Sequence, residues 1–333
     1  MRSGRFLCQL AAVGTVCLTV LGAAAPPAGA ATPQSVLLAR YEPVTQFDPL
    51  ETFAPTRVQS FIVDSELEQL VAPGTWRLVR ARAAPGDLPS DASAVWRLNQ
   101  RTCTPTMPLG GLACYTAAWQ QGGGGPVVYG RVAHEGDRLV LQYWYFYYDD
   151  VYSYTYPPSD FIWQAHEGDW EVVNVVLSNE EQPLYVGYSE HCLGASRDWS
   201  DTPRFDDTHP LVHVALGSHA NYFTAGVHPI NPRCIPDAAL AILRLQHLPL
   251  PADYAFAGPL AGPPAAHATV VPIEQIGDKD PSWLAFPGFW GESQYFHAPA
   301  PIGTIAFGNS PVGPAFQAVW RDPVGTIAAW SAG

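Results

Sequence analysis

The stretch Leu141-Gln142-Tyr143-Trp144-Tyr145-Phe146-Tyr147-Tyr148, which ends in Asp149-Asp150, decides the expected fold. Aromatic residues are enriched in β-strands, so a strand is predicted over Leu139–Tyr148. Four further runs of β-branched and aromatic residues, separated by Gly, Pro or Asp, also predict strands: Val127–Val132, Asp169–Leu177, Leu184–Ser189 and Leu211–Leu216. Because 33 prolines and 29 glycines supply turns, we expect an all-β protein, a β-sandwich with a few peripheral helices and long loops.

Helices are expected in two places. Residues 56–71 carry apolar residues at roughly helical spacing after Pro55, and a second helix is predicted to begin at Asp237. Glu135-Gly136-Asp137 reads as a hairpin turn between two strands. The Pro/Ala/Gly-rich residues 249–264 predict an ordered connector or a lid.

The N-terminus has the pattern of a secretory signal peptide. Arg2 and Arg5 precede an apolar run from Leu10 to Leu21, and small residues follow up to Ala30. The run is about 12 residues, shorter than the ~20 that span a bilayer, which disfavours the alternative of a membrane anchor. We therefore expect cleavage after Ala30, a secreted, extracellular protein made of one β-sandwich domain over residues 31–333, and no transmembrane segment.

The charge of the chain argues against nucleic acid as a partner. The formal net charge is −13, and Lys279 is the single lysine. Loss of Arg2 and Arg5 with the signal would make the mature chain more negative by two. A basic surface for phosphates is therefore not expected, whereas attraction of cations is.

Four cysteines remain once the signal and its Cys8 and Cys17 are removed: Cys103, Cys114, Cys192 and Cys234. An even number in an exported chain predicts two disulfides, and four cysteines allow three pairings. We favour Cys103–Cys114, which closes a short loop rich in Pro and Gly, and Cys192–Cys234, which joins two loops near the motifs described below.

A metal site is predicted around Ala165-His166-Glu167-Gly168-Asp169-Trp170-Glu171. Asp169 and Glu171 lie two apart in a predicted strand and so share a face. Two neighbouring carboxylates repel unless a cation or an arginine lies between them. Asp149, from the preceding strand, and His166 would complete a set of hard oxygens and one imidazole, which suits Ca²⁺ or Mg²⁺ better than zinc. Carboxylates that are solvated or paired with arginine are the alternative.

His219 is a second candidate functional residue. It lies in Gly217-Ser218-His219-Ala220-Asn221-Tyr222-Phe223, directly after a predicted strand, where functional side chains often gather. A histidine held by backbone groups is the alternative. His191 and His209 are weaker candidates, and neither a nucleophile elbow, a phosphate-binding loop nor a dinucleotide fingerprint is present.

The chain resembles the vacuolar protein sorting-associated protein 62 related family over residues 38–325. The resemblance is carried by the strand and the two motifs above, by Tyr188–Cys192, and by flanking elements at both ends: Arg40–Pro43, Phe47–Pro49, Phe289–Gly291 and Gly313–Phe316. Phe289 departs from the arginine expected of such relatives. The intracellular sorting role in the family's name does not fit an exported chain.

That family is distantly similar to the necrosis-and-ethylene-inducing toxins of plant-attacking microbes. The resemblance implies a β-sandwich and a motif, Gly-His-Arg-His-Asp-Trp-Glu, that helps to hold a divalent cation. Carried over residue by residue, the implied metal ligands are Asp149, His166, Asp169 and Glu171. Ala165, Glu167 and Gly168 replace the toxin's glycine, arginine and second histidine, so the cation site carries over better than the toxin activity.

Three functions are compatible with these features. The favoured one is a secreted, cation-dependent, toxin-like module that binds an extracellular glycan or a membrane lipid headgroup. The second is a metal-dependent hydrolase of phosphodiesters or esters, with His219 as general acid or base. The third is a structural extracellular domain without a ligand. The residues leave catalysis open and favour binding.

Overall fold

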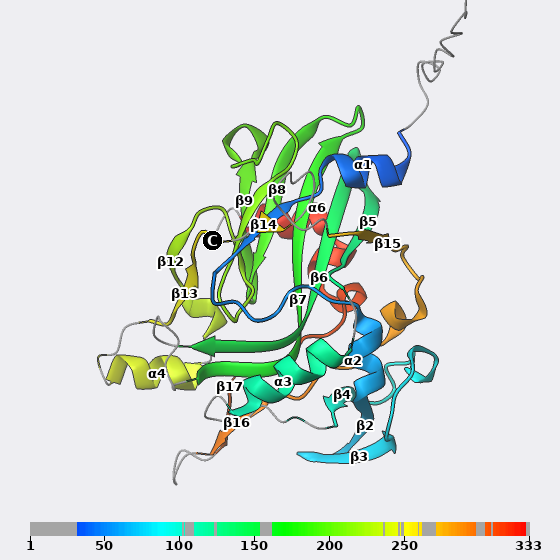
Figure 1. Ribbon diagram of the computed structural model, residues 1–333, viewed down its shortest axis with the longest axis vertical. Helices are drawn as coiled ribbons and strands as arrows, with labels where there is room; N and C mark the ends of the chain where they lie inside the picture. Colours follow the sequence, from blue (N-terminus) through cyan, green and yellow to red (C-terminus); the bar gives the residue numbers. More distant parts are fainter. Residues whose placement is uncertain are drawn as a thin grey trace, which may run out of the picture. The chain divides into compact units, whose positions relative to one another are not determined.

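Two long strands, β6 (Arg138–Ser153) and β7 (Ile162–Ser178), form the centre of the protein in a computed structural model (Figure 1). They pair in antiparallel fashion from Arg138 and Ser178 at one end to Ser153 and Ile162 at the other. Both strands are longer than predicted, because their pairing with each other continues past Asp150 and begins before Asp169. The two acids and the His166 motif therefore lie within strands and not beyond their ends.

Gln34–Gly333 form one compact unit. The predicted signal peptide, residues 1–30, lies outside the residues that the structure describes. These are 32–101, 103, 110–122, 125–153, 162–235, 237–245, 247, 250–258, 260–261, 271–297, 304–307 and 309–330.

The central sheet has six strands in the order β15-β5-β6-β7-β8-β9. All neighbours are antiparallel except the β15–β5 pair, which is parallel. The remaining strands of this sheet are β5 (Val128–Glu135), β8 (Pro183–Glu190), β9 (Leu193–Asp198) and β15 (Ile273–Gln275).

A second, four-stranded sheet covers one face of the central sheet. Its order is β11-β10-β1-β14, and its strands are β1 (Val44–Phe47), β10 (Leu211–Val214), β11 (Asn221–Tyr222) and β14 (Leu260–Ala261). Tyr188 of β8 joins the two sheets, since its hydroxyl donates to the carbonyl of Leu211 and its ring stacks on Phe223. The predicted all-β sandwich is confirmed.

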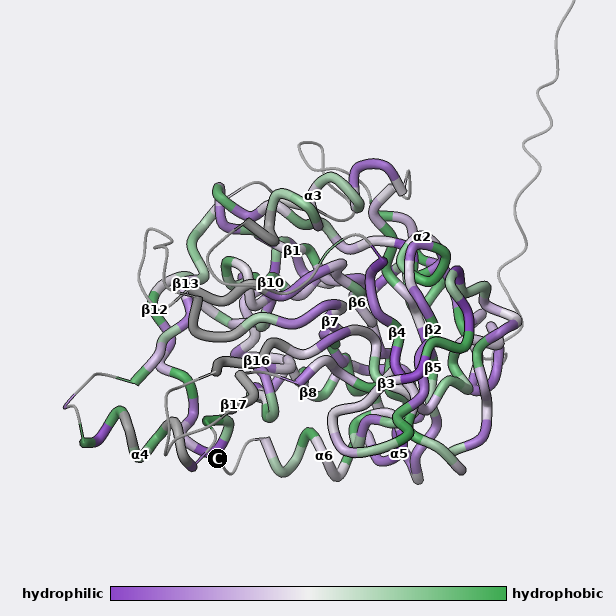
Figure 2. The backbone as a smooth tube through the Cα atoms, turned by 90° about the horizontal axis from the view of Figure 1, so that it is seen from below, coloured by the Kyte–Doolittle hydropathy of each residue, from purple (hydrophilic) through white to green (hydrophobic). Residues whose placement is uncertain are grey.

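Helices α5 (Ala318–Arg321) and α6 (Pro323–Trp330) cover the opposite face of the central sheet. The Gln142 side chain donates to the carbonyl of Val319, and Gly187 leaves room for Ile327 and Trp330. Figure 2 shows the resulting layers, with β1 and β10 on one side of β6, β7 and β8, and α5 and α6 on the other. The remaining helices are α1 (Gln34–Arg40), α2 (Val58–Asp64), α3 (Gly110–Gln121) and α4 (Asp237–Leu245).

Aromatic side chains fill the centre of the core. Trp170 contacts the rings of Phe146, Trp283 and Trp290, with centroids 4.9, 5.6 and 5.3 Å apart. Rings of this size remove a large apolar area from water. The tryptophans and tyrosines of the quoted strands are thus mainly core residues.

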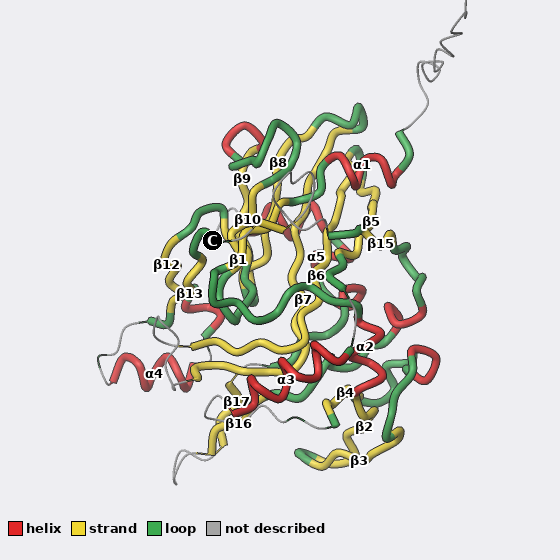
Figure 3. The backbone as a smooth tube through the Cα atoms, in the orientation of Figure 1, coloured by secondary structure: helices red, strands yellow, loops and turns green. Residues whose placement is uncertain are grey.

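The prediction of one helix over residues 56–71 is wrong in its second half. Helix α2 ends at Asp64, and β2 (Ser65–Ala72) follows at once (Figure 3). The Ser65 hydroxyl donates to the carbonyl of Phe61, and Leu67 is buried between β3 (Thr75–Arg80) and β4 (Trp96–Gln100). Pairing with two neighbouring strands overrides the local helical spacing.

Several other predictions can be compared with the structure. The helix from Asp237 and the turn at Gly136 are confirmed. Helix α3 was not predicted. Within residues 249–264 two strands occur, β13 (Ala252–Ala255), which pairs with β12 (Gly226–Pro229), and β14. Strands β16 (Gln294–His297) and β17 (Thr304–Phe307) pair with each other.

Both favoured disulfides are present, Cys103–Cys114 and Cys192–Cys234. The first links α3 to the segment after β4, and the second links the β8–β9 turn to the segment before α4. Among the described residues, no helix has both the length and the apolar character needed to cross a bilayer.

Candidate metal centre

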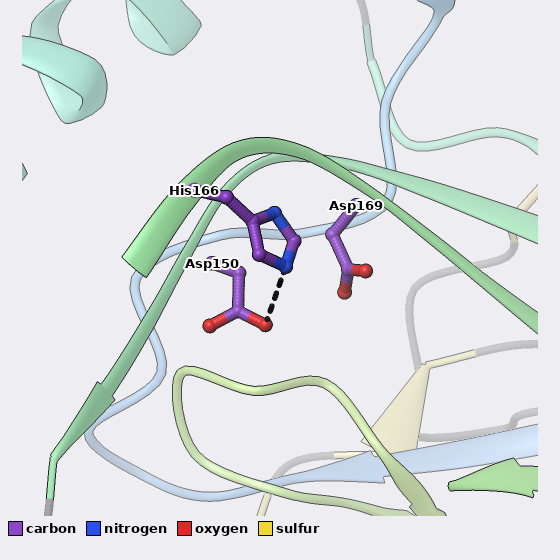
Figure 4. Close-up of side chains that lie close together, drawn as sticks. All are labelled: Asp150, His166 and Asp169. Atoms are coloured by element: carbon purple, nitrogen blue, oxygen red, sulfur yellow. Dashed lines mark ion pairs between the residues drawn. The ribbon is translucent and has the colours of Figure 1, made fainter. Parts of the chain in front are cut away.

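A bend at Gly168 shapes the site. Gly168 adopts a left-handed φ of 59°, and a Cβ placed there would lie 2.0 Å from the carbonyl oxygen of Trp290. Only glycine fits this close approach in this conformation. The Glu167 amide donates to the carbonyl of Glu292 at 2.9 Å, which ties the bent strand to the neighbouring segment. As a result β6 and β7 form an arch (Figure 4).

Asp150, His166 and Asp169 meet on the inner, concave side of this arch (Figure 4). One ligand atom from each lies within 4.8 Å of the other two, and the residues are only 3, 5 and 6% exposed. Asp150 lies opposite His166 in the β6–β7 ladder, and the bend brings Asp169 back to them. Two carboxylates and an imidazole so arranged can hold a cation.

His166 is oriented for this role. Its Nδ1 lies 2.9 Å from the carbonyl of Gly168, to which an Nδ1–H donates, and its Nε2 lies 3.3 Å from Asp150 Oδ2. Histidine ligands commonly donate one ring nitrogen to a carbonyl and use the other on the metal. Burial lowers the pKa of His166, but the Asp150 carboxylate outweighs it and raises the pKa to about 9.

Glu171 lies two residues beyond Asp169 and is also buried. Its carboxylate receives hydrogen bonds from the Ser189 hydroxyl and, at 3.4 Å, from the Asn221 side chain. Burial, followed by the charge of Asp169, raises the pKa of Glu171 well above its ordinary value. Of the four predicted ligands, His166 and Asp169 are in the group of three, and Glu171 lies beside it.

Asp149, the fourth predicted ligand, is replaced in this group by its neighbour Asp150. Asp149 lies opposite Glu167 in the ladder, whereas Asp150 lies opposite His166. Successive residues of a strand point to opposite faces, so the two aspartates face different sides of the outer half of the arch. The sequence predicts both aspartates at the end of the same strand, but it does not reveal the strand register that places them on opposite faces.

His219 lies against the centre and holds Asp169. It is fully buried, has a left-handed φ of 56°, and stacks on Tyr147 with ring centroids 3.8 Å apart. Its Nδ1 lies 3.1 Å from Asp169 Oδ2, and its Nε2 lies 3.6 Å from Glu51 Oε1. Burial lowers the pKa of His219, but the two carboxylates raise it to about 10.

Glu51 belongs to the surroundings of the site, since it faces His219, but it was not predicted from the sequence. Its carboxylate accepts hydrogen bonds from the amides of Thr52, Phe53 and Gly217. Burial raises its pKa, and the charge of His219 together with these hydrogen bonds lowers it below the ordinary value. No local sequence signal identifies Glu51, because its partner lies in a distant turn.

A second buried pair, His191 and Asp253, lies on the other side of the turn formed by residues 217–219. His191 Nε2 is 2.7 Å from Asp253 Oδ2, and the hydroxyls of Ser218 and Tyr222 donate to the same carboxylate. Burial lowers the pKa of His191, and Asp253 raises it to about 9. Asp253 was missed because it lies in the segment predicted as a connector.

A cavity of about 330 Å³ opens beside His191. Aromatic rings from Tyr222 and Trp330 and polar side chains from Glu190, Asn231 and Arg233 line it. The Cys192–Cys234 disulfide braces its wall, since Cys234 lines the cavity and Cys192 follows His191. This volume lies at the lower end of the range typical of small-ligand pockets.

Comparison with known proteins gives one curated relative and several solved structures. No family model matches the chain. A protein of Saccharomyces cerevisiae named as a candidate vacuolar protein sorting-associated protein, TDA6, is 28% identical over 193 residues, which cover 49% of this chain and 37% of that protein. The chain thus spans about a third of the relative's length.

The similar solved structures include proteins described as a toxin fold. One, described as a toxin fold for microbial attack and plant defense, is 13% identical, with a TM-score of 0.40 and coverage of 88% of this chain and 89% of the other. The protein NLPPya in complex with glucosamine and with mannosamine matches at 13 and 14% identity, with TM-scores of 0.39 and 0.40; it covers 88% of this chain in both, and 89 and 90% of the other chains. The chain therefore resembles both groups that its motifs suggested, a vacuolar sorting-associated protein and the necrosis-and-ethylene-inducing toxins.

Proposed function

We propose that this protein is exported and binds a hard divalent cation, Ca²⁺ or Mg²⁺, through Asp150, His166 and Asp169, and that the bound cation organises a site for a glycan or lipid headgroup. The observation that carries the proposal is the convergence of three buried ligand atoms within 4.8 Å. Glu171 completes the set either directly or through a water molecule.

The charge of the site supports a cation. Asp150 and Asp169 lie close together away from water, where two negative charges are unfavourable unless they are compensated. A divalent cation neutralises both, and carboxylate oxygens are the ligands that calcium and magnesium prefer. The hydrogen bond from His166 Nδ1 to Gly168 leaves Nε2 for the metal.

His219 has a positioning role in this proposal. Its Nδ1 holds Asp169, and the Glu51 carboxylate faces its other nitrogen. Because both ring nitrogens face carboxylates and the side chain is fully buried, this arrangement favours binding over the hydrolase alternative, in which His219 would exchange protons with a substrate.

The cavity beside His191 supports a glycan as the ligand. Aromatic rings supply faces for sugar rings, and the polar side chains around them can accept and donate hydrogen bonds to hydroxyls. The cavity is coupled to the metal centre, because Ser189, which binds Glu171, lies next to Glu190 of the cavity wall.

Cation binding is tested by calorimetry on metal-free protein titrated with CaCl₂ and MgCl₂. We expect Asp169→Asn and His166→Asn to weaken the titrated binding at least tenfold. Glu180→Gln, which removes an exposed carboxylate of the β7–β8 turn, is the matched control and should bind as the wild type does. Equal binding by all four proteins would refute the assigned ligands.

Ligand binding is tested with glucosamine, mannosamine, a glycan array and liposomes, with and without EDTA. The two amino sugars are the natural first probes because the toxin structures contain them. Binding that EDTA does not affect would refute a cation-organised site. A melting temperature unchanged by calcium and by EDTA would favour the structural domain without a ligand.

Export is tested by N-terminal sequencing of the protein secreted by its host. The expected first residue is Ala31. A secreted form that begins at Met1 would refute the predicted signal peptide.

A further inference from the structure

We propose that a second divalent cation binds on the outer, convex side of the arch, between the carboxylates of Asp149 and Glu167 and beneath helix α3. This site is separate from the one assigned to Asp150, His166 and Asp169. No residue is shared between the two sites.

The unpartnered carboxylate of Asp149 points to this ligand. Asp149 is 0% exposed, and neither of its carboxylate oxygens has a hydrogen-bond partner. A buried ionised carboxylate without partners is strongly unfavourable, so such groups are paired, protonated or bound to a metal.

Glu167 faces Asp149 directly across the ladder. It is also 0% exposed, and its carboxylate accepts hydrogen bonds from the Tyr115 hydroxyl at 2.7 Å and from the amides of Gln100 and Glu292. Residues opposite each other in antiparallel strands have Cβ atoms about 5 Å apart, so one ion can reach both carboxylates. Among the described residues, neither carboxylate forms an ion pair.

A cation satisfies Asp149 better than a proton does. A protonated carboxyl group carries an O–H donor that requires an acceptor. A proton on one Asp149 oxygen would neutralise only one carboxyl group of the pair and would leave the other Asp149 oxygen without a donor. A divalent cation contacts both oxygens and neutralises the two carboxylates together.

The experiment counts bound ions. Metal-free protein is dialysed to equilibrium against CaCl₂ and, separately, MgCl₂, and bound metal per chain is measured by mass spectrometry. Wild type and the control Glu180→Gln should bind two ions. Asp149→Asn and Glu167→Gln should each bind one, as should Asp169→Asn, and Asp149→Asn combined with Asp169→Asn should bind none.

The number of bound ions distinguishes the convex site from the concave site. One ion in the wild type that is lost in Asp149→Asn but kept in Asp169→Asn would support the convex site alone. A wild-type count that Asp149→Asn and Glu167→Gln leave unchanged would overturn the convex site. Near-ultraviolet circular dichroism confirms that each variant is folded, and Glu167→Gln gives the same reading if Asp149→Asn does not fold.

Discussion

The concave and convex sides of the β6–β7 arch contain carboxylates in different surroundings. On the concave side, Asp150 and Asp169 contact the rings of His166 and His219, which can carry positive charge. On the convex side, Asp149 and Glu167 face each other with amide and hydroxyl donors only, among the described residues. The comparison shows that one pair of strands can carry two pairs of carboxylates, of which one contacts histidines and the other does not. The concave pair is partly compensated by histidine charge, whereas the convex pair forms no ion pair among the described residues.

The largest expected effect comes from removing the bend that creates the two sides. Gly168→Ala places a Cβ 2.0 Å from the carbonyl oxygen of Trp290. We expect unfolding free energy to fall by about 4 kcal/mol or more, in the range of the most severe single substitutions, with cation binding lost on both sides. Urea unfolding followed by circular dichroism measures the loss.

Gly136→Ala is the matched control for that substitution. Gly136 has a nearly equal left-handed φ of 57°, but an added Cβ there meets no atom within 4 Å. Only the backbone strain of about 1–2 kcal/mol should remain. Equal losses in the two variants would show that close approach to Trp290 does not determine the bend.

The next largest effect is expected from breaking the buried pair of His191 and Asp253, which lies near the concave side. Asp253→Asn removes the carboxylate that pairs with buried His191, which should lower unfolding free energy by about 3–5 kcal/mol near neutral pH. Asp206→Asn, which alters the 3.8 Å contact of an exposed carboxylate with His209, should change it by about 1 kcal/mol or less. Thermal and urea unfolding of both variants measures the difference.

The loss in Asp253→Asn should depend on pH in a definite direction. The pKa of His191 is raised from 6.5 to about 9, so its stabilisation is complete below its ordinary pKa and lost as pH rises through about 9. The pKa of Asp253 is lowered, so its stabilisation is present above 3.8 and lost as pH falls through the lowered value. A difference from wild type that does not shrink above about pH 9 would contradict the pairing.

A smaller effect tests whether each side binds its own cation. A ligand at about a hundred times its dissociation constant stabilises the folded state by about 2.7 kcal/mol. Calcium should therefore raise the melting temperature of the wild type, and Asp149→Asn and Asp169→Asn should each keep about half of the increase. Differential scanning calorimetry with calcium and with EDTA measures it. A full increase in both variants would show that neither side accounts for it.

The smallest effect is expected from one hydrogen bond on the convex side. Tyr115→Phe removes the hydroxyl that donates to Glu167, which should lower unfolding free energy by about 1.5–3 kcal/mol. Tyr185→Phe is the control, because Tyr185 is only partly buried and its hydroxyl forms no hydrogen bond among the described residues. Urea unfolding of the two proteins compares them, and a larger loss in Tyr185→Phe would contradict the role given to Tyr115.

The sequence by itself determined five strands, four of them in the central sheet, and half of the predicted metal ligands. Runs of aromatic and β-branched residues are a local signal, so β5 to β8 and β10 could be predicted from their own residues. His166 and Asp169 could be predicted as partners because they lie three residues apart around a glycine. The cysteine pairs followed from a count of four and from the loops that each pair would close.

Only the tertiary structure decided the rest, because it depends on pairing between distant segments. The register of β6 against β7 places Asp150, and not Asp149, opposite His166, and a shift of one residue would exchange them. Glu51 and Asp253 reach their histidines from distant segments of the chain, so no local pattern marks them. Strand β2 formed in place of the second half of a predicted helix because β3 and β4 lie on both sides of it.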